Sequence, residues 1–476
     1  MWSSLRSPRS WTVVGLVVAT LFTALFATGL FTISQDRHPL SVVDEHIHFD
    51  TAAVAVDGII PFRGSLLSDA LVQEWACGVG HEGGGTLVPC GDPKLDASAI
   101  PSGKYSTGYI HYPTYFFLAA SFQPVWEALT GDAGLLSAFR AFSALCMTLG
   151  VIASGTMAWL LGLRGSRMLA ALSIPVATSM IVVLGVNVNP ASTTVLTGAL
   201  VAGTGLLWVR RNRGFVWFAL AGALSSAVAV TSSLPLGGFL LAMLAVLVVR
   251  RFRPDFATGW TPRWWQFILT SLIVLVPVFA WGRVIAARAT ITNAELYGFL
   301  PPSGRKDIIV GATRELATLH TPWRETMGIK AQPDAFLAQV VNAVSGGAPT
   351  WITAIVFGGL VLASLGLLWR RLPSTAQLDI APLALPGDTD RASAAVSGTH
   401  LVAIGSLVTV ILYPPALRIS NWLNFGFDFA IVERYSSALA PVLIISLLLL
   451  VRSVTLSRIL AVIGILTALG TVAGAA

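Results

Sequence analysis

Long apolar stretches separated by short polar ones dominate the pattern of this chain. A helix needs about 20 apolar residues to cross the hydrocarbon core of a bilayer, and stretches of that length recur along the sequence. We expect spans near 11–33, 138–161, 168–186, 190–209, 215–231, 234–249, 264–284, 350–369, 398–417, 435–451 and 457–475. The pattern predicts an all-α polytopic membrane protein with about eleven transmembrane helices in a single membrane domain over 1–476.

The first apolar run follows two arginines, Arg6 and Arg9, as it would in a secretory signal peptide. The run is longer than the apolar core of a signal peptide, and no small-residue cleavage site follows it. We therefore expect it to be retained as a membrane anchor.

Arginine clusters set the expected orientation, because loops rich in Arg and Lys remain on the cytoplasmic side. The clusters lie at 164–167, 210–213, 250–253, 370–371 and 452–458. All of them share one side with the N-terminus, provided that 112–126 does not cross the membrane. That stretch is short, aromatic and interrupted by Pro124, so we expect an interfacial helix there. The stretches 34–137 and 285–349 are then extracytoplasmic loops, and 370–397 is a cytoplasmic linker.

Composition narrows the class of protein. The chain is 55% hydrophobic and 11% charged, with a mean hydropathy of +0.75, whereas soluble proteins carry about 25% charged residues. The net charge of +7 does not indicate nucleic-acid binding, because the cations gather between the spans. The excess of Arg over Lys, with abundant Ala, Gly and Val, is typical of a GC-rich bacterial genome, and we expect a bacterial plasma membrane.

The cysteines divide into one apolar position and one pair. Cys146 lies within an apolar run and is expected to pack against helices. Cys77 and Cys90 flank the flexible stretch "GVGHEGGGTLVP" in the first loop. In an oxidising compartment they would form a disulfide, which would stabilise the fold by roughly 3 kcal/mol. A metal site is the less favoured alternative, since no second pair completes a tetrahedral set of ligands.

The decapeptide "SVVDEHIHFD", residues 41–50, places two acids and two histidines just beyond the first span. Asp44 and Glu45 have two readings, as the solvated start of a juxtamembrane helix or as a general base and divalent-ion site. Adjacent acids repel one another, which raises the pKa of one of them and suits base catalysis. His46 and His48 diverge on a helix, which favours a polar scaffold over metal ligands.

Two further stretches, together with these acids, form a pattern of motifs along the chain. "HYPTYFFLAASFQPVWEALTGDAGLLSAFRAFSAL" (111–145) combines an aromatic–proline segment, a TGD turn and an arginine, and "VERYSSALAPVLIISLLLLV" (432–451) opens a late span with Arg-Tyr. In this order they resemble the GT-C superfamily of membrane glycosyltransferases. The protein O-mannosyltransferases, the aminoarabinose transferases of lipid A and actinobacterial multi-span proteins are similar. The chain departs from the family pattern at 112–115, where "YPTY" replaces a double proline, and in its Cys-bounded, Gly-rich insertion.

The resemblance implies a GT-C-like bundle with juxtamembrane helices in a large first extracytoplasmic loop. It implies transfer of a sugar from a polyprenyl-phosphate donor to an envelope glycan, lipid or protein, at the surface of the lipid bilayer. Asp44 would be the base and Glu45 its electrostatic or metal-binding partner, which leaves Mg²⁺ or Mn²⁺ open as a cofactor.

Cations are needed to stabilise a departing phosphate, and Arg matches phosphate oxygens with a planar fork. Arg434, followed by Tyr435 in the Arg-Tyr motif, is favoured for this role. Arg283 and Arg288 end a span on the external side, and Arg418 lies in a short external loop. For Arg288 and Arg418, phosphate binding and contact with lipid headgroups remain equal alternatives.

Three other polar residues lie near the interfacial helix. His111 and Lys104 are candidates for acceptor or phosphate contacts. Arg140 is expected to pair with Asp132 or with a headgroup.

Two other function classes compete with an enzyme. A transporter or flippase of lipid-linked glycans would carry ionisable residues within its spans, and these runs are nearly free of them. A non-catalytic GT-C-like scaffold for envelope assembly would not need the acidic pair. No nucleotide-binding or nucleophile-elbow motif is present in the sequence.

Overall fold

A computed structural model of the chain describes residues 8–252, 260–296, 303–318, 320–323, 348, 350–364, 389–428, 431–451 and 453–475. The α-helices are α1 (Pro8–Gln35), α2 (Glu45–Val56), α3 (Asp69–Ala76), α4 (Thr114–Thr130), α5 (Leu135–Leu160), α6 (Ser166–Ser173), α7 (Ser179–Val186), α8 (Thr194–Arg211), α9 (Phe215–Val228), α10 (Leu234–Phe252), α11 (Trp264–Arg288), α12 (Asn293–Leu296), α13 (Arg305–Ala317), α15 (Thr389–Phe425), α16 (Ala440–Leu450) and α17 (Val454–Ala475). Short 3-10 helices are η2 (Ala97–Ala99), η3 (Gly108–Ile110), η4 (Ile174–Val176), η5 (Pro190–Thr193), η6 (Thr231–Ser233) and η7 (Glu433–Leu439).

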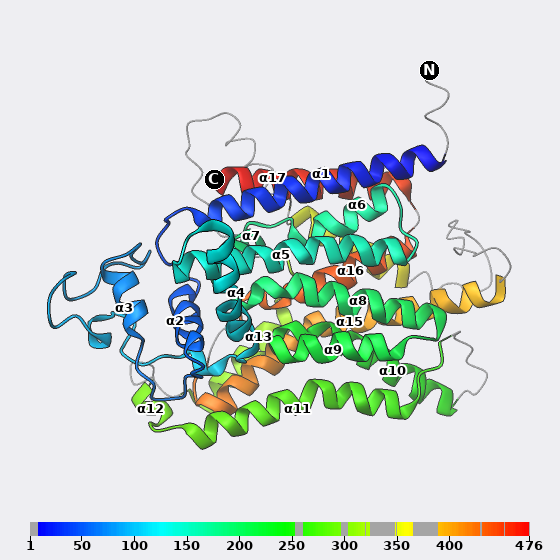
Figure 1. The fold of residues 1–476 in the computed structure, drawn as a ribbon. Coiled ribbons are helices and arrows are strands. Elements are labelled where there is room, and N and C mark those ends of the chain that lie inside the picture. Colours follow the sequence, from blue (N-terminus) through cyan, green and yellow to red (C-terminus); the bar gives the residue numbers. More distant parts are fainter. Residues whose placement is uncertain are drawn as a thin grey trace.

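The long helices run side by side as a bundle, and α2 and α3 gather at one end of it (Figure 1). Within the described ranges, 8 helices are long and apolar enough to cross a membrane. Helix α6 with η4, and α7 after it, form a pair bent by 70°, which is either one broken span or a re-entrant loop. The shorter apolar helices are α9 and Thr350–Ser364. Eight of the eleven expected spans coincide with these candidate helices, and the span expected at 168–186 coincides with the bent pair. At 215–231 and 350–369 the described helices are α9 and Thr350–Ser364, which are shorter. Residues 365–388, which include most of the predicted linker, lie outside the described part. The protein is a polytopic all-α membrane protein.

Burial separates the inner helices from those at the rim. The apolar windows of α8 and α16 are 78% buried, as expected for helices surrounded by others. In α11 the corresponding window is 6% buried, and it exposes large apolar side chains such as Trp264 and Phe279. Such a helix is expected to face lipid, because in water its large apolar surface would be exposed to solvent at a high cost in free energy.

The segment 34–137 is a folded unit with its own core. Phe49 of α2, Trp75 of α3 and Tyr115 of α4 are buried together against Phe139 of α5. Helix α4 covers the stretch expected to lie in the interface, and it is not among the candidate spans. Since α2 packs on α4 and α4 on α5, the first residues of α2 are fixed to the bundle.

Cys77 and Cys90 form a disulfide that closes the Gly-rich segment after α3. The Trp75 indole of α3 donates a hydrogen bond at 2.9 Å to the carbonyl of Gly84, which lies inside this segment. Cys146 is buried and free, in line with its predicted packing role.

We expect the double substitution Cys77→Ser and Cys90→Ser to destabilise this unit by about 3 kcal/mol, because the reduced chain regains the entropy of an open loop. Thermal unfolding in detergent, compared with the Cys146→Ser control, measures the effect. Equal unfolding temperatures for the double variant and the wild type would contradict the expectation.

Candidate active site

Asp44, from the segment after the first span, and Arg434, from the start of a late span, are in contact. Asp44 immediately precedes α2, and Arg434 lies in η7, 390 residues further along. Arg434 Nη2 donates to Asp44 Oδ2 at 3.2 Å. The Asp44 side chain is 56% exposed and that of Arg434 is 14% exposed. The acidic pair and the Arg-Tyr motif, which were separate in the sequence, therefore form one site with an accessible carboxylate.

The backbone at Asp44 directs its carboxyl away from the helix. Asp44 is the N-cap of α2, but its φ of 59° is left-handed and its side chain makes no capping hydrogen bond. Aspartate is a favoured N-cap because its carboxylate accepts from the first N–H groups. Left-handed backbone in a non-glycine residue is also unfavourable and is found at functional sites. The conformation leaves the carboxylate free to face Arg434.

The surroundings of Asp44 favour its neutral form. Desolvation by the protein raises the pKa of the Asp44 carboxyl above its usual range, and the Arg434 charge acts against this rise. A carboxylate with a raised pKa is a stronger base than a solvated one and can still be ionised at neutral pH.

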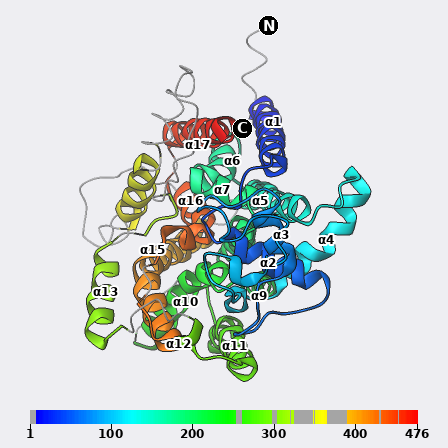
Figure 2. The same cartoon turned by 90° about the vertical axis from the view of Figure 1, so that its left-hand side faces the viewer.

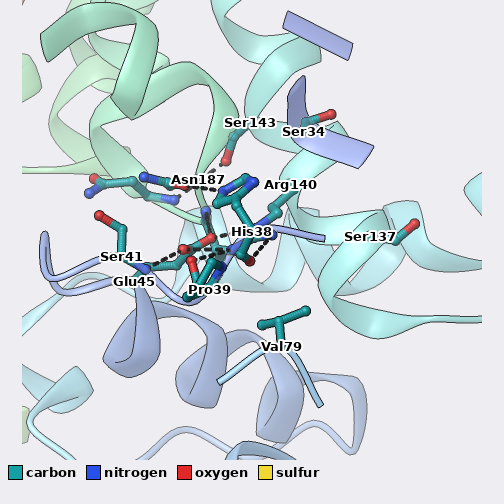
Figure 3. Close-up of polar contacts among 12 residues, drawn as sticks. Ser34, His38, Pro39, Ser41, Glu45, Val79, Ser137, Arg140, Ser143 and Asn187 are labelled. Atoms are coloured by element: carbon teal, nitrogen blue, oxygen red, sulfur yellow. Dashed lines mark hydrogen bonds and ion pairs between the residues drawn. The ribbon is translucent and has the colours of Figure 1, made fainter. Parts of the chain in front are cut away.

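Glu45 has a different place from its neighbour. It is fully buried, and its two oxygens accept from the Arg140 guanidinium at 2.8 and 3.0 Å (Figure 3). They also accept from the backbone N–H groups of Ser41 at 2.8 Å and Val188 at 2.9 Å. With both oxygens engaged, Glu45 holds α2 to α5, and its carboxylate is not exposed as that of Asp44 is.

The partner of Arg140 corrects the expectation from the sequence. Arg140 pairs with Glu45, whereas the Asp132 carboxylate accepts from Ser137 Oγ and the Gly134 N–H. Arg140 Nη1 also donates to the His38 carbonyl at 3.1 Å, so it ties the chain leaving α1 to α5.

The two members of the acidic pair differ in what they present to a divalent ion, because the Asp44 side chain is exposed and the oxygens of Glu45 are engaged by Arg140 and two backbone N–H groups. Among the described residues, no group of three or more His, Cys, Asp or Glu side chains could hold a metal. A role for Mg²⁺ or Mn²⁺ would rest on Asp44 and substrate oxygens alone, as Mg²⁺ sites at phosphates often do.

Imidazoles lie on both sides of α2. His48 of α2 and His111 have ring centroids 4.7 Å apart, and His46 and His81 have theirs 5.0 Å apart. Desolvation, and next the Arg434 charge, lower the pKa of His111 to about 4, and desolvation lowers the pKa of His48 well below its usual value. Both rings are therefore neutral hydrogen-bonding groups near Arg434 at physiological pH.

We expect low pH to destabilise the folded segment 34–137 through protonation of His111. Its pKa is about 4 when folded and about 6.5 when unfolded, so the unfolded state binds more protons between these values. Stability is therefore present above pH 6.5 and decreases as the pH falls to 4, by on the order of 2–3 kcal/mol. Thermal unfolding from pH 7.5 to pH 4 should show a flatter decline in His111→Gln than in the wild type, and identical slopes would contradict the assignment.

The remaining predicted site residues are distributed more widely. Tyr435 lies beside Arg434, with the guanidinium 5.5 Å from its ring centre. Arg288 donates to the Ile60 carbonyl at 3.0 Å, and Arg283 is exposed on α11. Lys104 is exposed, with its ammonium 5.2 Å from the Tyr105 ring centre. No recorded contact in the described ranges joins Arg283, Arg288 or Lys104 to Asp44, whereas His111 is close enough to Arg434 for its pKa to respond.

Comparison with known proteins adds a structural likeness. No family model matches the chain, and no curated protein matches its sequence. Two solved structures are similar, both of ArnT from Cupriavidus metallidurans, one bound to undecaprenyl phosphate and one in the apo state. Each covers 97% of this chain and 78% of the solved chain at 14% identity, with TM-scores of 0.35 and 0.33. At these TM-scores the likeness carries no inference about activity.

Proposed function

We propose that this protein is a membrane glycosyltransferase of GT-C type. It would move a sugar from a polyprenyl-phosphate donor to an acceptor in the cell envelope, on the extracytoplasmic face of a bacterial plasma membrane, with its N-terminus in the cytoplasm. The observation that carries the proposal is the pairing of an accessible carboxylate, Asp44, with the guanidinium of Arg434 at the end of the bundle where α2 and α3 gather.

Asp44 and Arg434 suit the two requirements of a nucleophilic displacement, which are activation of the attacking hydroxyl and stabilisation of the leaving phosphate. Asp44 would take the proton of the acceptor hydroxyl as its oxygen attacks the anomeric carbon. The bond between that carbon and the phosphate oxygen would break, leaving polyprenyl phosphate, whose charge Arg434 would stabilise. One displacement inverts the anomeric carbon. Neutral His111 and Tyr435 would lie beside the phosphate as hydrogen-bonding groups.

The proposal is tested with the purified protein in nanodiscs, given a panel of radiolabelled polyprenyl-phosphate sugars and envelope acceptor extracts. We expect labelled acceptor together with an equal amount of polyprenyl phosphate. A lipid-linked sugar that crosses the bilayer of proteoliposomes intact would instead support a flippase. If a correctly folded protein shows neither sugar transfer nor transport of the lipid-linked sugar, the result would support a non-catalytic scaffold.

The pH profile should report on the contact between Asp44 and Arg434. The base is active when ionised, so kcat/KM rises as the pH passes the pKa of Asp44. The Arg434 charge lowers this pKa, and removing it raises the pKa. We therefore expect the acid limb of the profile to move to higher pH in Arg434→Gln and to remain in place in Arg283→Gln, an exposed control. An unmoved limb in Arg434→Gln would show that Asp44 is not the titrating base.

A further inference from the structure

A second buried charge cluster lies between α13 and the end of α15, which are adjacent (Figure 2). Arg418 of α15 donates from Nη1 to Glu315 Oε1 at 2.6 Å and from Nη2 to Asp428 Oδ2 at 2.6 Å. Its Nε donates to the other Asp428 oxygen, so this pair is bidentate. The three side chains are 12%, 6% and 19% exposed for Arg418, Glu315 and Asp428. We name these residues the Arg418 cluster.

The Arg418 cluster holds the chain that leads into the candidate site. The Ile431 N–H donates to Glu315 Oε1 at 3.4 Å, three residues before Arg434. The Asp428 N–H donates to Ser303 Oγ at 2.8 Å, and the Ser303 N–H donates to the Gly426 carbonyl at 3.2 Å. Gly426 and Asp428 are therefore attached to Ser303, and Ile431 is attached to α13.

The chemistry of the Arg418 cluster requires arginine. The planar guanidinium presents several donors in a fixed fork, which allows bonds to two carboxylates at once, whereas an ammonium on a flexible stem does not reproduce this geometry. Charges this buried are stable only when they are paired. Since its guanidinium is engaged by both carboxylates, Arg418 is held away from the phosphate-binding and headgroup-binding roles that the sequence left open.

We propose that Arg418 is a positioning residue, which sets Arg434 against Asp44 through Glu315 and the Ile431 N–H, while Asp428 fixes the chain that follows α15. Arg418 acts on the site only by placing η7, so its effect depends on the presence of Arg434. The choice of polyprenyl phosphate as ligand rests on the proposed function. The effect of Arg418 on the position of η7 can be measured without that ligand.

A double-mutant cycle separates positioning from general loss of stability. Binding of radiolabelled polyprenyl phosphate is measured in nanodiscs for the wild type, Arg418→Lys, Arg434→Gln and the double variant. We expect Arg418→Lys to weaken binding about tenfold in the wild-type background and less than about twofold in Arg434→Gln, as residues that act through one another do. Equal weakening in both backgrounds would overturn the proposal. Arg314→Lys, at an exposed position of α13, is the matched control and should bind as the wild type does.

Hydrogen–deuterium exchange tests the same inference without any ligand. Arg418→Lys should raise amide exchange in η7 and leave exchange in α17 unchanged, because only the segment beside the Arg418 cluster is released. Exchange in η7 that equals the wild type, or that rises equally in α17, would overturn the proposal. Absence of polyprenyl-phosphate binding by the wild type, with the local rise in η7 present, would reject the proposed function and retain the positioning role.

Discussion

Substitution of Asp44 by asparagine is expected to reduce sugar transfer by about a thousandfold, within the range that a general base contributes. Asparagine has the same shape and can still accept a hydrogen bond from Arg434, so the contact and the fold should persist. It cannot take a proton from the acceptor hydroxyl at neutral pH. The loss should therefore appear in kcat at saturating donor, with donor binding changed little.

The measurement compares initial transfer rates of Asp44→Asn and the wild type at one pH, after both have shown equal thermal stability. Asp57→Asn is the matched control, because Asp57 is exposed at the other end of the same helix. Equal rates for Asp44→Asn and the wild type would remove Asp44 from the chemistry and place the base elsewhere.

The largest expected loss of stability follows from breaking the buried pair of Glu45 and Arg140. Arg140→Gln leaves the Glu45 carboxylate in a site where its side chain has 0% exposure, with only two backbone N–H groups as partners. Removing one member of a buried ion pair typically costs about 3–5 kcal/mol. We expect a reduction of this size in the free energy of unfolding, and weaker transfer, because α2 and Asp44 lose their attachment to α5.

Combining Arg140→Gln with Glu45→Gln tests the cause of that loss. Without a charge on either side, the double variant should be more stable than the sum of the two single changes predicts. Arg283→Gln, an exposed control on α11, should differ from the wild type by less than about 0.5 kcal/mol. Additive losses would show that the two side chains stabilise the fold independently, which would contradict the paired geometry.

The helices could be predicted because their signal is local. An apolar run of sufficient length determines a span whatever its neighbours are. The shorter run at 112–126, interrupted by Pro124, lies largely within α4, which is not among the candidate spans. The disulfide between Cys77 and Cys90 was predictable for a similar reason, since the two cysteines bound one flexible segment. These features depend on the residues within a short window.

The pairings within the site depend on contacts between distant segments. Nothing near Glu45 indicates that its partner lies 95 residues away on α5, or that Arg140 faces inward from a helix whose start also offers Asp132. The adjacent acids look equivalent in the sequence, yet the turn at residue 44 exposes one carboxylate and buries the other. Only the resemblance to the GT-C superfamily placed Asp44 and Arg434 in one site. That resemblance rests on the order of the motifs along the chain, and the spacing of residues within each motif does not indicate the contact.

The most direct test is photo-crosslinking of a polyprenyl-phosphate sugar that carries a diazirine on its sugar, followed by mass spectrometry of the labelled peptides. The account predicts label in the peptides that contain Asp44 and Arg434, with competition by unlabelled donor and loss of label in Arg434→Gln. Label confined to other parts of the chain, or label that unlabelled donor does not reduce, would contradict the assignment of this site to a lipid-linked sugar.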